Sequence, residues 1–324
     1  MEVGPGRVYD ERIVSSPLTE EMLRPVEARF SSVRLKTPLA DPEYRRVAAF
    51  MEQHPQAVLT LAHPYHDEIT DLEFLRFFPF LPLFIVNFRS LESLDGLRHL
   101  SESVERLGVL RTKRPLDLSV LRQLRRIRTL EIESHTKHLE VLSEMTWLED
   151  LTLRSITLSD LSLLLPLTGL LRLDIKLGGT KHLSLLPRIG KLHYLELWMI
   201  KGLSDISPIG ELTQLRYLFL QALKNVTALP DLRRAKHLRR VHLETMKGLR
   251  DLRPLATAPA LEQLALVSMC HLQPADLKCL VGHPTLKGVT AGLCSDRKNA
   301  AVAALLGLPE ASPSNATEWR DVQS

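Results

Sequence analysis

The sequence predicts an α/β solenoid in which short parallel strands, joined by short returns, stack into one long sheet. Two observations predict this architecture. A six-residue unit, apolar-x-x-apolar-x-apolar, recurs along most of the 324-residue chain. Hydrophobic residues make up 44% of the chain, although aromatic residues make up only 5%. Leucine must therefore fill the core, which suits a stack of thin layers better than a globule built around large rings.

The repeat is regular enough to define a register. Successive units begin 21 to 23 residues apart, and nine of them follow one another. Their three apolar positions are Leu81/Phe84/Val86, Val104/Leu107/Val109, Ile127/Leu130/Ile132, Leu148/Leu151/Leu153, Leu170/Leu173/Ile175, Leu192/Leu195/Leu197, Leu215/Leu218/Leu220, Leu238/Val241/Leu243 and Leu261/Leu264/Leu266. Weaker copies begin at Val58 and Leu286. Alternation with period two predicts a strand with one buried face, and each unit leaves room for a turn and a short helical or irregular return.

Both ends of such a stack need caps, because they would otherwise expose an apolar layer. Asp41 before Pro42 predicts the N-cap of a helix over about residues 42–53, preceded by a strand at residues 30–35. Ser295 predicts the N-cap of a second helix that ends near Leu306. We therefore divide the chain into an N-terminal cap (1–56), a solenoid of about 9–11 repeats (57–292), a C-terminal cap helix (293–309) and a disordered tail (310–324).

The repeat resembles the leucine-rich-repeat family, and its spacing is most similar to that of the bacterial internalin-like type. The segments 202–209 and 248–255 resemble the short return of that type. The resemblance covers about residues 58–291 and implies a right-handed solenoid with the parallel sheet on the concave side and the returns on the convex side. In one respect the chain departs from the family, which usually places Asn three residues after the third apolar position. Here that position holds Ile156, Ile200, Leu223, Met246 and Met269, so we expect apolar packing in place of a hydrogen-bonded Asn ladder.

Function is expected on the solvent face of the sheet, because the outward residues of adjacent strands form one surface. Four rings, those of Tyr194, Trp198, Tyr217 and Phe219, fall on two adjacent strands, within about 10 Å of one another given the strand spacing. Exposed rings rimmed by charge are typical of protein-binding hot spots. The predicted rim consists of Arg172, Asp174, Lys176, Glu196, Arg240, His242 and Glu244. Alternatively, the rings only pack on one another as cross-strand pairs or are covered by a terminal segment.

A nucleic-acid binder is a second hypothesis. Lys and Arg number 42 against 38 Asp and Glu, and the formal charge of +4 is too small to indicate nucleic acid. Two basic clusters, Arg122/Arg125/Arg126/Arg128 and Arg233/Arg234/Lys236/Arg239/Arg240, mostly precede strands. That position favours a solvated outer edge, and no interleaved glycine or aromatic residue suggests base stacking.

A metal-dependent binder is the other form of this second hypothesis. Cys270, His271, Cys279, His283 and Cys294 gather near the C-terminal cap, and His63, His66, Asp67 and Glu68 lie together after the first weak strand. The second set does not have the spacing of a structural zinc site and is expected to form a polar loop. The first set is looser, and Cys270 lies next to an apolar repeat position, where a cysteine is often a small buried hydrophobic residue. Three cysteines, an odd number, predict no disulfide framework. The sequence implies no cofactor.

Catalysis is not indicated. The chain has no Gly-rich phosphate loop, no Gly-x-Ser-x-Gly elbow and no His-Glu-x-x-His motif. An open, solvated sheet is also expected to leave the pKa values of face residues such as Glu131, Glu133 and Asp150 near their ordinary values. The charged N-terminus has no secretory signal, and the most apolar stretch, residues 77–88, is too short to span a bilayer. The sequence therefore predicts a cytoplasmic, non-enzymatic protein-interaction module without membrane association, and leaves its partner and oligomeric state open.

Overall fold

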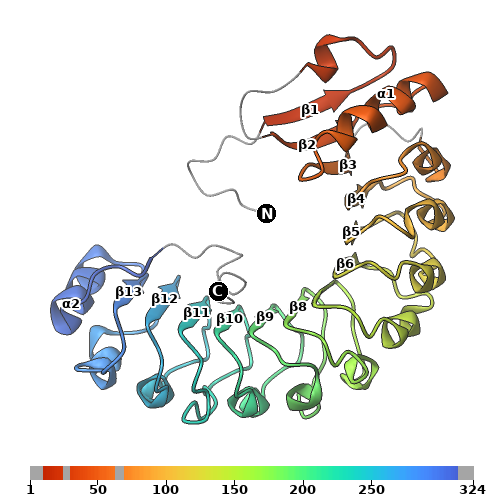
Figure 1. Ribbon diagram of the computed structural model, residues 1–324. Coiled ribbons are helices and arrows are strands. Elements are labelled where there is room, and N and C mark those ends of the chain that lie inside the picture. The colour runs from red at the N-terminus through yellow and green to blue at the C-terminus, as the bar shows by residue number, and fades with distance from the viewer. Residues whose placement is uncertain (1–9, 25–29, 63–68, 313–324) are drawn as a thin grey trace. The chain divides into compact units, whose positions relative to one another are not determined.

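The computed structural model (Figure 1) describes residues 10–24, 30–62 and 69–312. The chain forms two compact units. Unit 1 is Met1–Leu148 and unit 2 is Glu149–Ser324. The group formed by His63, His66, Asp67 and Glu68 lies outside the described residues. Within the described ranges, no helix is both long and apolar enough to cross a bilayer.

Unit 1 contains parallel strands that pair in chain order. They are β1 (Asp10–Val14), β2 (Phe30–Leu35), β3 (Val58–Ala62), β4 (Leu83–Asn87), β5 (Arg106–Val109) and β6 (Thr129–Glu133). The returns are the 3-10 helices η1 (Glu21–Leu23), η2 (Glu73–Phe77), η3 (Asp95–Leu100), η4 (Ser119–Gln123) and η5 (Leu139–Glu144). Each predicted strand of this unit is present, and β1 is an additional strand that the charged N-terminal sequence did not indicate.

Helix α1 (Asp41–Glu52) packs beside η2 in unit 1. Its N-cap is Ala40 rather than the predicted Asp41, and the carboxylate of Glu43 accepts hydrogen bonds from the backbone N–H groups of Ala40 (2.8 Å) and Leu18 (2.6 Å). The ring of Tyr44 stacks on the ring of Phe74 with centroids 5.0 Å apart. The helix therefore begins one residue early because the carboxylate of Glu43, at the third helical position, accepts the N–H of the N-cap residue Ala40.

Unit 2 repeats the same plan, with its strands lining one side and its returns the other (Figure 1). The strands are β7 (Asp150–Arg154), β8 (Arg172–Lys176), β9 (Tyr194–Trp198), β10 (Tyr217–Gln221), β11 (Arg240–Glu244), β12 (Gln263–Val267) and β13 (Gly288–Ala291), all parallel. The returns are η6 (Ser162–Leu164), η7 (Leu186–Arg188), η8 (Ser207–Glu211), η9 (Arg253–Thr257) and η10 (Pro274–Leu280). The predicted parallel sheet with short returns is thus confirmed in both units.

The apolar repeat positions form the core. In β9, for example, Leu195 and Leu197 are fully buried, and each such side chain contributes roughly 1.5–3 kcal/mol. The position three residues after the last strand apolar residue is also buried: Ile156, Ile200, Leu223, Met246 and Met269 are all at most 4% exposed. The expectation that apolar packing replaces the Asn ladder at these positions is confirmed.

The returns begin in the same way in several repeats. The carboxylates of Asp117, Asp160, Asp205 and Asp251 each accept the backbone N–H two residues further on, at 2.7–2.9 Å. This local bond satisfies an N–H that the tight 3-10 turn leaves unpaired. Side-chain hydrogen bonds from His138, Ser162 and Arg253, followed by this backbone bond, lower the pKa of Asp117, Asp160 and Asp251, whereas the backbone bond is the main cause of the lowered pKa of Asp205. An Asp at this point of the repeat therefore starts the return.

The last layer of unit 2 is covered by α2 (Asp296–Leu306), whose N-cap is Ser295 and whose C-cap is Gly307 in the left-handed conformation. A disulfide between Cys270 and Cys294 links the turn after β12 to the residue before this helix cap. The expectation that the cysteines form no disulfide is therefore wrong. Their separation of 24 residues is about one repeat, so stacking of adjacent repeats brings them together.

Candidate functional site

The predicted site residues lie on adjacent strands of one face of the unit 2 sheet. The strand register aligns three columns across β8, β9, β10 and β11. The first column is Arg172, Tyr194, Tyr217 and Arg240; the second is Asp174, Glu196, Phe219 and His242; the third is Lys176, Trp198, Gln221 and Glu244. The structure thus brings all eleven predicted residues onto four neighbouring strands.

Two of the four rings are buried, so the prediction of four exposed rings is wrong. Tyr194 is 6% exposed and Tyr217 is 7% exposed, and their ring centroids are 4.8 Å apart. Phe219 packs against this pair, and its ring meets the imidazole of His242 edge-on at 4.3 Å. Phe219 and Trp198 remain half-buried. The tyrosines therefore form the cross-strand pair of the alternative interpretation, while Phe219 and Trp198 keep part of their surface exposed.

A buried ion network lies beside the rings. The carboxylate of Asp174, only 1% exposed, contacts the guanidinium of Arg172 at 2.8 Å and the ammonium of Lys176 at 3.3 Å. The same ammonium lies 3.1 Å from the carboxylate of Glu196, which also accepts a hydrogen bond from the hydroxyl of Tyr194 at 3.0 Å. Each buried charge therefore has an opposite charge in contact, which offsets the cost of removing it from water.

The network extends to β7. The carboxylate of Asp150 lies 3.7 Å from the guanidinium of Arg172, and the hydroxyl of Thr152 donates to Asp174 at 3.3 Å. Sequence reasoning had placed Asp150 on this face but not in the site. The signal that could have found it is the register, because Asp150 is aligned directly with Arg172.

Burial shifts the pKa of several face residues, contrary to the expectation for an open sheet. Desolvation and the charge of Asp174 raise the pKa of Glu196 despite the contact with Lys176. Desolvation also raises the pKa of Tyr194. Desolvation and the neighbouring Arg240 lower the pKa of His242 to about 4. The physical reason is that long side chains from adjacent strands exclude water from these groups, so the face is less solvated than alternation alone implies.

On β10 and β11, residues of the site contact one another and residue Ser312. The amide of Gln221 donates to the carboxylate of Glu244 at 2.8 Å, and the imidazole Nε2 of His242 lies 3.3 Å from the same carboxylate group. Arg240, 8% exposed, donates from Nη1 to the backbone oxygen of Ser312 at 2.7 Å. A segment near the C-terminus therefore reaches this face.

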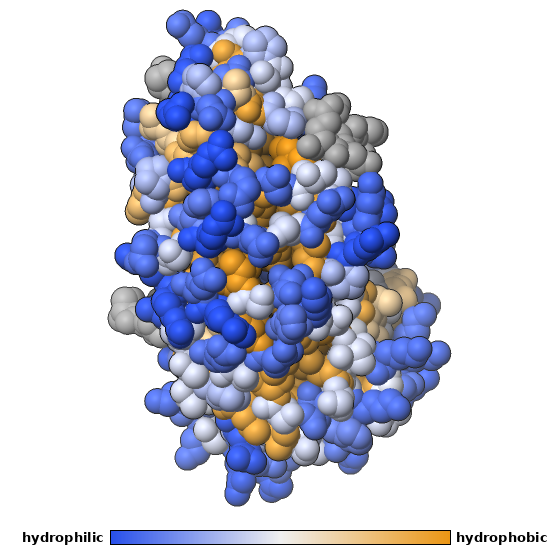
Figure 2. Space-filling view, turned by 90° about the vertical axis from the view of Figure 1, so that its right-hand side faces the viewer, coloured by the Kyte–Doolittle hydropathy of each residue, from blue (hydrophilic) through white to orange (hydrophobic). Residues whose placement is uncertain are grey.

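The basic clusters are paired locally. Arg122 contacts Glu144 at 3.4 Å, Arg126 contacts Glu105 at 3.8 Å, and Arg125 stacks over the ring of Trp147 at 4.5 Å. In the second cluster, Arg233 contacts Asp231 at 2.7 Å and Arg239 contacts Glu262 at 4.0 Å. Figure 2 shows hydrophilic side chains flanking a broken strip of apolar ones on the side of the molecule that faces right in Figure 1. The local pairing supports a solvated edge.

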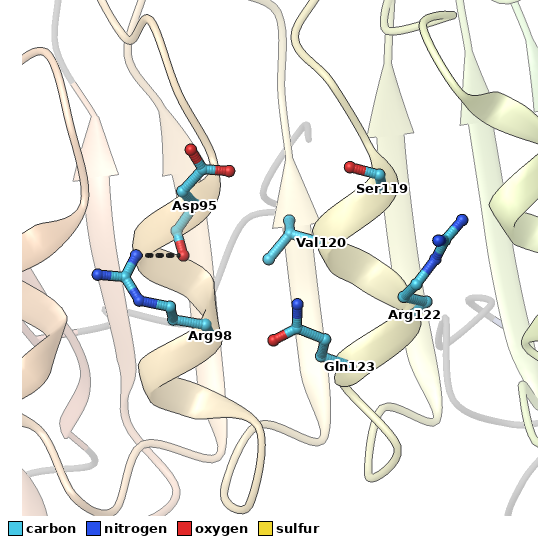
Figure 3. Close-up of a pocket in the computed structure, with 6 residues that line it drawn as sticks. All are labelled: Asp95, Arg98, Ser119, Val120, Arg122 and Gln123. Carbon is cyan, nitrogen blue, oxygen red and sulfur yellow. Dashed lines mark hydrogen bonds between the residues drawn. The ribbon is translucent and has the colours of Figure 1, made fainter.

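A cleft of about 390 Å³ lies between η3 and η4 of unit 1 (Figure 3). Its lining comprises Asp95, Arg98, Ser119, Val120, Arg122 and Gln123. The guanidinium of Arg98 donates to the carboxylate of Glu73 at 2.8 Å and to the backbone oxygen of Asp95 at 2.9 Å. Because both arginines of the cleft are engaged with acidic neighbours, the cleft presents little uncompensated charge to a ligand.

The Cys/His set does not converge on one point. Cys270 and Cys294 are bonded to each other, and His271 Nε2 lies 2.6 Å from the backbone oxygen of Leu249. Burial raises the pKa of the free Cys279 thiol. In the part of the chain that the structure describes, no three His, Cys, Asp or Glu side chains are arranged to hold a metal ion. Nothing in that part therefore supports the metal-dependent hypothesis.

Comparison with solved structures identifies the fold. An internalin (InlF) from Listeria monocytogenes is similar with a TM-score of 0.54 and 16% identity, over 89% of this chain and 81% of that one. Internalin C2 from the same organism has a TM-score of 0.48 and 23% identity, over 60% of this chain and 83% of that one. The functional domain of InlJ from that organism has a TM-score of 0.47 and 15% identity, over 81% of this chain and 58% of that one. No protein-family model and no curated protein matches the sequence. The chain has the leucine-rich-repeat fold.

Proposed function

We propose that the chain is a non-enzymatic protein-interaction module that binds a partner protein on the face formed by β8 to β11. The observation that supports this most directly is the grouping of the half-buried Trp198 and Phe219 with charged residues of both signs. Aromatic side chains surrounded by charged ones are typical of protein-binding hot spots. A repeat fold presents them on one continuous surface.

The chemistry of this face favours binding over catalysis. Its buried acids, Asp174 and Glu196, are engaged by the cations of Arg172 and Lys176 and by the hydroxyl of Tyr194. A general base needs a carboxylate that can reach a substrate proton. Carboxylates held in this way instead fix the shape and charge pattern of a surface.

The test is affinity capture from a lysate of the source organism with wild-type chain and a Trp198→Ala variant. Truncation of a central aromatic anchor is expected to weaken binding by roughly thirtyfold, or about 2 kcal/mol. Trp198 suits this test better than Tyr217, because the 7% exposed Tyr217 stacks on Tyr194 and its removal would disturb the fold.

Val281→Ala is the matched control, because Val281 is a large apolar residue of unit 2, 54% exposed, that lies outside the site. The control should capture the same protein as the wild type. Equal capture by the wild type and the Trp198 variant would contradict the proposed face. Salt-sensitive retention of nucleic acid by all three chains would instead support the nucleic-acid hypothesis.

A further inference from the structure

Residues 309–312, which follow α2, lie against the sheet face of unit 2. The backbone oxygen of Pro309 accepts the N–H of Val289 at 2.9 Å, on the edge of β13 that faces away from β12. Three residues later, the N–H of Ser312 donates to Oε1 of Gln263 at 3.0 Å. The oxygen of Ser312 accepts from Nη1 of Arg240 at 2.7 Å. Residues 309–312 are therefore contacted from β13, β12 and β11.

Apart from Val289, the residues that contact this segment lie in the first column of the site or in its continuation along β12 and β13. The register aligns Gly288, Gln263 and Arg240 with one another, and the same column continues to Tyr217 and Tyr194. Ala311 lies over Gly288 of β13, and the side chains of Gln263 on β12 and Arg240 on β11 reach across to Ser312. Residues 310–312 therefore lie at the β13 end of this column and are contacted from three adjacent strands.

Gly288 makes room for that segment. A Cβ atom at this position would lie 2.9 Å from Cα of Ala311 and 3.1 Å from the backbone oxygen of Glu310. Both distances are shorter than ordinary van der Waals contact, and the atoms involved are backbone atoms that cannot move aside independently. A side chain at position 288 would therefore exclude the segment.

These three hydrogen bonds contact the backbone of the segment. They use two carbonyl oxygens and one N–H of residues 309–312, whereas no side chain of these four residues takes part in them. Arg240 and Gln263 supply one donor and one acceptor, which is the complement of a peptide unit. A phosphate backbone has acceptors but no N–H donor for Gln263, so this arrangement suits a polypeptide better than a nucleic acid.

We propose that the first column is a binding site for a peptide segment of the partner protein, and that residues 309–312 are an internal competitor for it. This inference rests on the proposed function and specifies the kind of partner. The backbone of the peptide contacts Gly288, Gln263 and Arg240, and these contacts hold it. The adjacent Tyr217 and Tyr194 continue the column toward the ion network.

The experiment uses a fluorescent synthetic peptide with the sequence of residues 308–324, added to the full chain. The Ser312→Pro variant of the chain lacks the N–H that bonds to Gln263, so its own segment should occupy the column less. We expect the peptide to bind this variant at least tenfold more tightly than the wild type. N-methylation of the peptide at the residue equivalent to Ser312 should abolish that gain, whereas replacing its Glu310 and Ser312 side chains by Ala should change affinity less than threefold.

Variants of residues on the sheet face test where the peptide binds. Adding Gly288→Val to the Ser312→Pro chain should eliminate binding of the peptide. Adding Gln263→Leu instead should also eliminate it, and this second variant keeps the test valid should the valine disturb β13. Thr290→Ala is the control, because Thr290 lies on β13 and faces the same side but is aligned with Ala265 in the next column. Its affinity should equal that of the Ser312→Pro parent.

Unchanged binding of the N-methylated peptide, or unchanged binding to the Gln263→Leu chain, would overturn the proposal. Failure of the peptide to bind Ser312→Pro would also overturn it, while capture of a protein that depends on Trp198 would still support the proposed function. Peptide binding that follows the predicted pattern, without any capture of a protein that depends on Trp198, would support the peptide site in the first column. The same result would contradict the proposal that β8 to β11 bind a partner protein.

Discussion

The two units bury different kinds of polar residue. The buried polar residues described in unit 1 are neutral, namely Ser90, Ser103, Thr112 and His135, and lie outside the strands. Unit 2 also buries one neutral residue outside its strands, Thr180, but it buries four charged residues as well, Asp150, Asp174, Glu196 and Arg240, and all four lie in strands. Both units therefore bury neutral polar residues outside their strands, whereas the buried charges of the described residues lie on the sheet face of unit 2.

This difference supports the proposal that the binding face lies in unit 2. A neutral group such as His135 stabilises its own turn: its Nδ1 accepts the N–H of Leu116 at 3.0 Å, and its Nε2 lies 2.9 Å from the oxygen of Leu110. Buried ion pairs, in contrast, often add little stability over apolar residues of similar size. A cluster of them on an outward face is better explained by what the face binds than by folding.

The largest expected effect tests the ion network directly. Asp174→Ala leaves the cations of Arg172 and Lys176 without their shared carboxylate, and removal of one partner from a buried pair typically costs about 3–5 kcal/mol. Urea unfolding should show this loss in the free energy of unfolding. Arg233→Ala breaks an exposed ion pair in the same unit and should have little effect. Similar results for the two variants would mean that the network does not matter for stability.

Much of the fold could be predicted from the sequence, because the repeat positions that define the core are read directly from leucine spacing. The burial of Tyr194 and Asp174 could not be predicted in this way. Outward residues alternate with buried ones, but their exposure depends on side chains from neighbouring strands, such as Arg172 and Lys176 over Asp174. Likewise, the contacts of Pro309 and Ser312 use backbone atoms, which leave no pattern in the sequence.

The second prediction concerns the disulfide, which occurs in unit 2, whereas unit 1 contains no cysteine. Closing a loop of 24 residues should stabilise unit 2 by about 3 kcal/mol in the chain-entropy model. Reduction should therefore speed hydrogen exchange of amides in β12, β13 and α2 while leaving β3 to β6 unchanged. Equal acceleration of hydrogen exchange in both units would show that unit 1 also responds to reduction of the disulfide.

The redox state of this pair in cells also tests the predicted cytoplasmic location, because disulfides persist mainly in oxidising compartments. Thiol-trapping of the protein from intact cells distinguishes the two states of Cys270 and Cys294. Free thiols would agree with the cytoplasm, and a bonded pair would contradict it. The location stays a prediction until this is measured.

The third prediction concerns His135, the buried histidine in a turn of unit 1. His135→Leu leaves the N–H of Leu116 and the oxygen of Leu110 without their buried partner, which should cost about 2 kcal/mol. His135→Asn should recover part of this loss, since an amide can offer both a donor and an acceptor. An Asn variant as unstable as the Leu variant would mean that packing, not hydrogen bonding, makes His135 important.

The same histidine should make stability depend on pH. Desolvation lowers the pKa of His135 in the folded state below its ordinary value of 6.5, so the folded state binds fewer protons than the unfolded state. Its contribution to stability is therefore complete above pH 6.5 and is lost as pH falls toward the folded-state pKa. Unfolding measured from pH 8 to pH 5 should show this slope in the wild type and a smaller slope in His135→Asn.

The smallest expected effect concerns Glu196 and has the opposite sign. Desolvation and Asp174 raise the pKa of Glu196 above 4.5, so the folded state holds its proton to a higher pH than the unfolded state does. The stability from this group is present below pH 4.5 and is lost as pH rises through the folded-state pKa. Glu196→Gln mimics the protonated form and can keep the hydrogen bond from Tyr194, so it should change the free energy of unfolding at pH 7 by less than about 1 kcal/mol. A loss near that of Asp174→Ala would instead show that the contact with Lys176 outweighs desolvation, and that Glu196 is held as a charged member of the network.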